Sequence, residues 1–164
     1  MPSQFRNLYP NYLLEQFSEA RIGGDARIIL ASESSLNEDY QNHTNEVKLF
    51  VKEHQNHNTL LLQIPYQRAK VIADEQKFPS TDVGVFGNEF IVFFVPEDSG
   101  DVACSCKLIM EPLGNQRKME WHEYLRRING EAKEIKLVKE NMYLKERSTD
   151  EIEADSERLL KRYK

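Results

Sequence analysis

Two short apolar runs, separated by a long amphipathic segment, constrain the fold of this chain more than any other feature. Residues 27–32 read Arg-Ile-Ile-Leu-Ala-Ser, and residues 59–64 read Thr-Leu-Leu-Leu-Gln-Ile. Consecutive aliphatic residues are typical of strands that are buried on both faces. Strand, helix, strand is the crossover unit of a parallel sheet. We therefore expect the two runs to lie side by side and to point the same way.

The segment between the two runs predicts one helix over residues 36–54. Ser35 and Glu38 fit a capping box, in which the serine oxygen accepts one free backbone N–H and the glutamate reaches back to another. The expected buried stripe recurs at helical spacing and consists of Leu36, Tyr40, Val47, Phe50 and Val51. A helix of this kind would cover one face of the predicted sheet.

The rest of the chain alternates between helical and extended patterns. Further helices are expected at residues 7–22, 66–77 and 116–128, and further strands at residues 82–86, 89–95 and 102–110. Gly23-Gly24 and Asn129-Gly130 are natural stops for the first and last of these helices. Gly87-Asn88 is a two-residue turn that accepts positive φ, so the three strands are expected to form an antiparallel meander.

These elements together predict an α/β fold. We expect a mixed sheet of about five strands, two or three of them parallel and the others an antiparallel meander, flanked by helices. Residues 1–130 are expected to form this α/β domain. Residues 131–164, which are dense in charges of both signs, are expected to form a C-terminal extension with a peripheral helix that starts at Ser148 and Glu151.

The charge and hydropathy of the chain disfavour two classes of partner. Its 164 residues include 22 basic and 27 acidic side chains, a net charge of −5, so no cationic field would hold a nucleic acid. No apolar run approaches the roughly 20 residues of a membrane helix, and the first residues lack the order of a signal peptide. We expect a soluble cytoplasmic protein that binds no membrane.

Cys104 and Cys106 are the only cysteines. On a strand both would point to the same face, where a disulfide across a single residue would be strained. A structural zinc site needs about four ligands. We expect reduced, structural thiols and no cofactor, while a redox or metal role stays the alternative.

No complete catalytic, metal or nucleotide signature is present. His54 and His57 would reach one ion only if the helix continued past Asn56, so a polar helix-end loop is the favoured interpretation. Glu134-Ile135-Lys136 matches half of a metal-dependent nuclease motif, but it lies far after the predicted sheet in the charge-dense segment. The catalytic residues therefore stay unassigned, and no metal site is expected.

Position in the fold indicates a site better than any motif does. Open sheets bind ligands beyond the carboxyl ends of their parallel strands. The candidate ligand-binding residues are Glu33, Tyr66, Arg68, Asp82 and His122. A Glu33–Arg68 pair is either part of such a site or a structural salt bridge, and the structural role is favoured. His122 is either a core neighbour of Trp121 or a site residue.

Residues 79–90 read Pro-Ser-Thr-Asp-Val-Gly-Val-Phe-Gly-Asn-Glu-Phe and follow a strand–helix–strand unit. This order of elements and the pattern D-x-G-x-F-G-x-x-F resemble the late part of phospholipase D-like halves in bacterial regulators and defence-associated proteins. The resemblance covers about residues 8–128. Active members of that family carry H-x-K followed by an acid, and the histidine attacks a phosphodiester. This sequence has no H-x-K near that strand, so the resemblance implies a degenerate domain without the family's chemistry.

Three functions follow as hypotheses. The leading one is a non-catalytic binding or regulatory domain of a bacterial or phage-like type, which engages a protein or a small ligand at the strand-end cleft. The alternative is a phosphodiesterase or nuclease whose active site is assembled from dispersed acids and His122. A third hypothesis is that residues 131–164 mediate a homo-oligomer or the docking of a partner.

Overall fold

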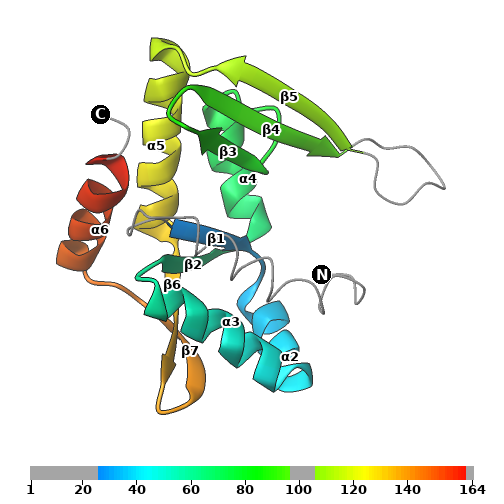
Figure 1. Ribbon diagram of the computed structural model, residues 1–164, viewed down its shortest axis with the longest axis vertical. Helices are drawn as coiled ribbons and strands as arrows, with labels where there is room; N and C mark the ends of the chain where they lie inside the picture. Colours follow the sequence, from blue (N-terminus) through cyan, green and yellow to red (C-terminus); the bar gives the residue numbers. More distant parts are fainter. Residues whose placement is uncertain (1–25, 97–105, 162–164) are drawn as a thin grey trace. The chain divides into compact units, whose positions relative to one another are not determined.

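The computed structural model describes residues 26–96 and 106–161 (Figure 1). Its helices are α2 (Glu33–Asn42), α3 (Thr44–Asn56), α4 (Tyr66–Glu75), α5 (Asn115–Glu131) and α6 (Thr149–Lys161). Its strands are β1 (Ala26–Leu30), β2 (Leu60–Ile64), β3 (Val83–Phe86), β4 (Phe90–Pro96), β5 (Cys106–Pro112), β6 (Lys133–Val138) and β7 (Asn141–Lys145). The helix expected over residues 7–22, and Cys104, lie outside the described residues.

The described chain divides into two compact units. The first comprises residues 26–65 and 132–152, and the second comprises residues 66–96, 106–131 and 153–161. The fold is thus mixed α/β with a C-terminal helix, as predicted. The prediction of one sheet with about five strands is wrong, because the described strands form one sheet of four and another of three.

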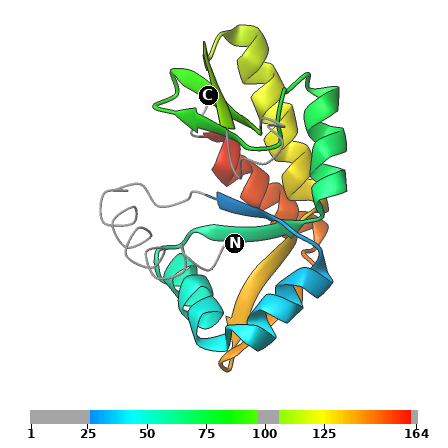
Figure 2. The ribbon, with the colours of Figure 1, turned by 90° about the vertical axis from the view of Figure 1, so that its right-hand side faces the viewer.

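The first unit contains the parallel pair that the two apolar runs predicted. β1 and β2 pair in parallel, with Ala26 opposite Leu60 and Leu30 opposite Ile64. The sheet continues through β6 and β7, both antiparallel to their neighbours. Helices α2 and α3 lie on the same side of β1 and β2 (Figure 2). The core on that side is built around Val51, Leu61 and Ile135.

The helix predicted over residues 36–54 is broken into α2 and α3 at His43, whose φ of −138° and ψ of 50° are not helical. The hydroxyl of Thr44 donates a hydrogen bond to the Tyr40 carbonyl oxygen at 2.7 Å. Such local bonds compete with the regular helical ladder. The predicted cap is wrong as well, because Ser35 lies inside α2 and its backbone N–H donates to Ser32 Oγ at 3.1 Å.

Strands β6 and β7 lie in the segment that was expected to be a charged extension. Their inward apolar side chains pack against the core of α2 and α3; they are Ile135, Leu137, Met142 and Leu144. The turn between the strands is Lys139-Glu140, with φ of 50° and 64°. A turn of this geometry usually uses Asn or Gly, so its sequence carries no hairpin signal. Where the chain divides into independent domains stays a prediction.

The second unit is one antiparallel sheet packed on two helices. β4 pairs with β3 and with β5, and α4 and α5 lie on one side of the three strands (Figure 2). The predicted turn between β3 and β4 is confirmed, since Gly87 and Asn88 both have φ of 59°. Three aromatic rings join sheet and helices, with Phe78 in contact with both Phe93 and Tyr124.

Helix α5 continues past the predicted stop at Asn129-Gly130 and ends at Glu131. Asn129 is buried, and its side-chain Nδ2 donates to Ser156 Oγ of α6 at 2.7 Å. This tertiary bond gives the amide a partner inside the protein, so Asn129 does not act as a helix cap. The predicted start of α6 is confirmed, because Glu151 N–H donates to Ser148 Oγ at 3.2 Å.

Replacing Asn129 with alanine should lower the free energy of unfolding by about 1–2 kcal/mol, because Ser156 then loses a partner inside the protein. Urea unfolding followed by the fluorescence of Trp121, the only tryptophan, measures the change in this unit. Ser156→Ala should have a similar effect, and the double variant should cost less than the two single costs together. Additive costs would contradict the role of the hydrogen bond.

Within the described helices, none combines the length and the apolar character that a bilayer span requires.

Candidate functional site

The two charged residues predicted at the strand ends each pair within their own unit. Glu33, at the first turn of α2, forms an ion pair with Lys133 of β6. Arg68 of α4 makes a two-pronged contact with Glu131 of α5, at 3.0 Å from Nε and 2.8 Å from Nη2. The Glu33–Arg68 salt bridge considered above is therefore replaced by two separate ion pairs. Tyr66 opens α4 and is exposed.

Asp82 lies just before β3 and next to a buried tyrosine. Partial burial raises the pKa of the Asp82 carboxyl above its usual range. Burial, and after it the charge of Asp82, raises the pKa of Tyr124 to about 12. The Tyr124 hydroxyl donates to the Thr81 carbonyl oxygen at 3.4 Å. Tyr124 therefore stays protonated at neutral pH and holds the start of the sheet rather than offering a base.

His122 lies half-buried on α5, directly after the buried Trp121. The structure thus places Tyr66, Arg68, Asp82 and His122 in the second unit and Glu33 in the first. Whether these five residues bind a ligand stays a prediction.

The nuclease alternative depended on Glu134 and Lys136, which lie in β6, inside the four-stranded sheet. Their position far from the sheet was wrongly predicted, because β6 was not recognised. The two side chains approach each other at 3.8 Å. In the sheet register Glu134 lies between Leu62 and Lys145, so neither neighbour supplies the second carboxylate that Mg²⁺ would need. Over the described residues, no group of three or more metal-binding side chains is gathered.

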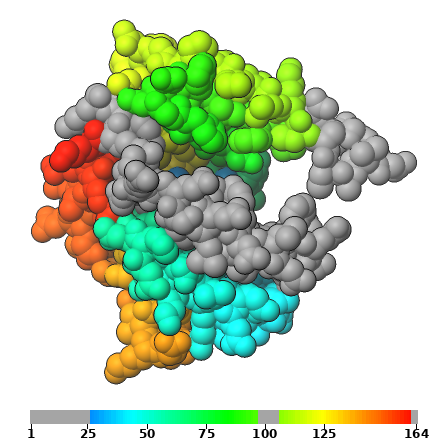
Figure 3. Space-filling model, in the orientation of Figure 1, coloured from blue at the N-terminus to red at the C-terminus, as the bar shows by residue number. Residues whose placement is uncertain are grey.

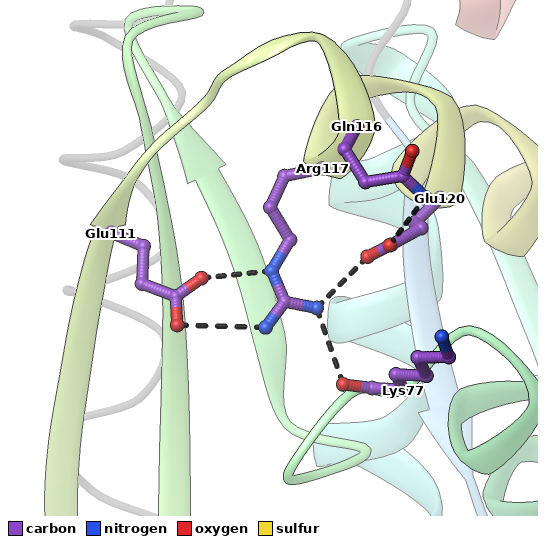
Figure 4. Close-up of polar contacts among 5 residues, drawn as sticks. All are labelled: Lys77, Glu111, Gln116, Arg117 and Glu120. Atoms are coloured by element: carbon purple, nitrogen blue, oxygen red, sulfur yellow. Dashed lines mark hydrogen bonds and ion pairs between the residues drawn. The ribbon is translucent and has the colours of Figure 1, made fainter.

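A cluster around Arg117 ties the second unit together (Figure 4). The guanidinium of Arg117, on α5, donates to Glu111 of β5 at 2.8 Å and to Glu120 at 2.9 Å. It also donates to the Lys77 carbonyl oxygen at 3.2 Å. The hydrogen bond to Glu111 is the main cause that raises the pKa of Arg117 above its ordinary value.

The same guanidinium lies over two rings of the core. Its central carbon is 5.1 Å from the ring centre of Phe93 and 5.7 Å from that of Phe78. A cation over an aromatic face is attracted by the ring quadrupole. Arg117 thus contacts two carboxylates, one carbonyl oxygen and two rings. These contacts connect β5, α5 and the loop after α4.

The opposite face of the three-stranded sheet is open and apolar. Its large exposed side chains, which we call the open face, are Phe86, Phe90, Phe94, Leu108 and Met110. They alternate along the strands with inward residues such as Ile91 and Phe93, which are fully buried. Figure 3 shows the green strands at the surface on the side that faces the viewer.

The register places the open face in rows. Phe86 lies opposite Phe90, and Phe94 lies opposite Leu108. Between these rows Val92 lies between Gly84 and Met110. The Phe86 ring leans back over Gly84, where an added Cβ would lie 3.3 Å from the ring.

None of the residues of β3, β4 and β5 on this side of the sheet carries a charge. They are Gly84, Phe86, Phe90, Val92, Phe94, Pro96, Cys106, Leu108, Met110 and Pro112. Cys106 is a free, exposed thiol at one end of the face.

The sequence reasoning missed both the Arg117 cluster and the open face. The signal for the cluster was weak, since only the spacing of Arg117 and Glu120 on one helix pointed to it. The open face had a stronger signal. β4 reads Phe-Ile-Val-Phe-Phe-Val-Pro, so both of its faces are apolar, although the described helices α4 and α5 lie on one side of it (Figure 2).

No family model, curated protein or solved structure matches this chain.

Proposed function

We propose that this chain is a non-catalytic binding domain that docks another protein on the open face. The observation that carries the proposal is the exposure of its five large apolar side chains, which ranges from 37% for Phe94 to 59% for Met110. With about 200 Å² for a large apolar side chain, these five present on the order of 500 Å² to water. The largest apolar patch on a protein surface is of about this size and is often functional.

A protein fits this surface better than a small molecule does. Small ligands take concave sites that surround them, whereas one face of a three-stranded sheet offers contact from a single side. A protein surface with its own apolar centre can cover the whole face, and the partner's matching region must be uncharged because the face offers no charge to pair with it.

A lipid surface fits less well than a protein. Anionic membranes attract peripheral proteins through clusters of basic residues. The chain carries a net charge of −5, and Glu89 lies in the turn next to Phe90. Electrostatics would therefore oppose an approach to such a membrane.

The Arg117 cluster lies on the helix side of the sheet, opposite the open face, and it favours the proposed function by holding β5 in place. Glu111 belongs to β5 and faces the helices, so its bond to Arg117 fixes the strand that carries Leu108 and Met110. A sheet held in this way presents a rigid surface, which lowers the entropy cost of binding.

A photo-crosslinking amino acid, p-benzoylphenylalanine, in place of Phe90 should give a discrete covalent adduct with a protein when the full chain is expressed in its native cell. The same replacement at Met119, an exposed residue of α5 away from the face, is the matched control and should give none. Mass spectrometry identifies the adduct. An absence of adducts at Phe90, or equal adducts at both positions, would contradict the proposed function.

A further inference from the structure

We infer that the protein docked on the open face is a second copy of this chain, so that two three-stranded sheets pack face to face around a two-fold axis. The inference rests on the proposed function and names its partner. Two observations carry it: the absence of charge on the face, and the symmetric spacing of Phe90 and Phe94 about Val92 on β4.

The uncharged face makes a second copy a suitable partner. Two copies of a chain with a net charge of −5 repel each other, and a charged contact surface would meet the same charges on its twin. The strand residues on this side of the sheet carry no charge, since Lys107 and Glu111 of β5 lie in register with the opposite side, so the two copies can meet here without pairing like charges. A two-fold interface requires one patch that complements itself, and an apolar patch meets that requirement.

The arrangement on β4 suits a two-fold axis. Phe90 and Phe94 lie on either side of Val92 on the central strand, with the same spacing in both directions. An axis that passes beside Val92 would bring Phe90 of one copy against Phe94 of the second copy, twice. Aligned packing of two sheets is a common way to cover apolar sheet faces.

The exposed area of the open face sets the expected affinity of the dimer. A stable interface of standard size uses about 800 Å² on each partner. The five exposed side chains supply about 500 Å², which is below this standard size, so the dimer should be weak and should dissociate in the micromolar range of concentration. The chain should therefore exchange between monomer and dimer rather than form a permanent dimer.

Sedimentation velocity of the full chain, from about 5 to 500 µM, tests the inference. We expect a reversible monomer–dimer equilibrium that is unchanged or tightened by added salt, because salt screens the repulsion between the two acidic copies. A monomer at every concentration would overturn the inference, and so would a dimer that salt dissociates. The monomer result would leave the proposed function standing if the Phe90 adduct contained a different protein.

Two variants locate the contact. Phe94→Thr and Leu108→Thr keep a strand-forming residue and remove apolar area from the face, so each should weaken the dimer at least tenfold. Met119→Gln removes an exposed apolar side chain of the same unit outside the face and should change the dissociation constant less than twofold. A dimer that persists in both threonine variants would overturn the inference.

A second measurement is independent of these variants. Cys106 lies at the end of the open face, so a dimer should shield its thiol. In a Cys104→Ser background, the rate of maleimide labelling at Cys106 should fall severalfold as the protein concentration rises through the dissociation constant. A constant labelling rate over a range in which dimers form would show that the dimer uses another surface.

Discussion

Replacing Arg117 with methionine should lower the free energy of unfolding of the second unit by roughly 2–3 kcal/mol. The change keeps much of the side-chain volume but leaves Glu111 and Glu120 without their shared cation. Glu120 is only 12% exposed, so its carboxylate cannot recover full hydration. Removing one partner of a buried ion pair costs about 3–5 kcal/mol, and the partial exposure of this cluster places it at or below the low end of that range.

Urea unfolding followed by Trp121 fluorescence measures the effect of Arg117→Met, because Trp121 lies one turn further along the same helix. Arg126→Met is the matched control. Arg126 pairs with Glu123 on the same helix at the surface, where such pairs contribute at most about 1 kcal/mol. Arg117→Lys should fall between the two, because lysine keeps the charge but not the planar fork. Equal losses for Arg117→Met and Arg126→Met would refute the role of the cluster.

The contrast between the parallel pair and the hairpin shows which parts of this fold local sequence can predict. Residues 28–30 and 60–62 are consecutive aliphatic residues, a pattern typical of strands that are buried on both faces. The strands and their parallel pairing were predicted correctly, but only β2 is buried along its whole length; β1 is half-buried because it lies at the edge of the sheet. Strands β6 and β7 alternate as well, but their outward residues are mostly polar and include the charged Glu134, Lys136 and Lys145. The density of charges in this segment masks the alternation, and the Lys139-Glu140 turn carries no residue that signals a hairpin.

Tertiary contacts decided the details that local rules predicted wrongly. Asn129-Gly130 has the composition of a helix stop, yet the bond from Asn129 to Ser156 lets α5 continue. His54 was expected in a polar loop at the end of a helix, and the structure buries it completely. In each case a residue 20 or more positions away, or the packing of a core, outweighs the local preference.

For the candidate site at the strand ends, the sequence predicted a place in the fold but not the contacts that its residues make. The carboxyl ends of parallel strands are a general place for ligands, and the residues found there by sequence include Glu33 and Arg68, whose charges are balanced by Lys133 and Glu131. The open face depends on which side of β4 the helices cover. Because both sides of β4 are apolar, sequence alone does not distinguish the core side from the exposed side.

Burial of His54 should make the first unit sensitive to acid. The ring lies against Phe50, and because the Phe50 carbonyl oxygen can only accept, Nδ1 carries the proton in their 2.7 Å hydrogen bond. Burial, and to a smaller extent the positive charge of Arg27, lowers the pKa of His54 from 6.5 to about 4. Between these two values the unfolded chain binds a proton at this position and the folded chain does not. The stabilising contribution of an uncharged His54 is therefore fully present above about pH 6.5, and it is lost progressively as the pH drops towards 4.

Lowering the pH from 7.5 to 5.0 should reduce the free energy of unfolding by about 2 kcal/mol through His54, at up to about 1.4 kcal/mol per pH unit. Most carboxylates stay ionised over this interval. Urea unfolding followed by far-UV circular dichroism measures the change, since Trp121 reports on the other unit. His54→Leu should remove this difference between the two pH values whatever its effect at pH 7.5. His57→Gln, which removes the exposed histidine at the end of α3, should retain it. An equal pH dependence in His54→Leu and the parent chain would show that His54 is charged at no cost in the folded state.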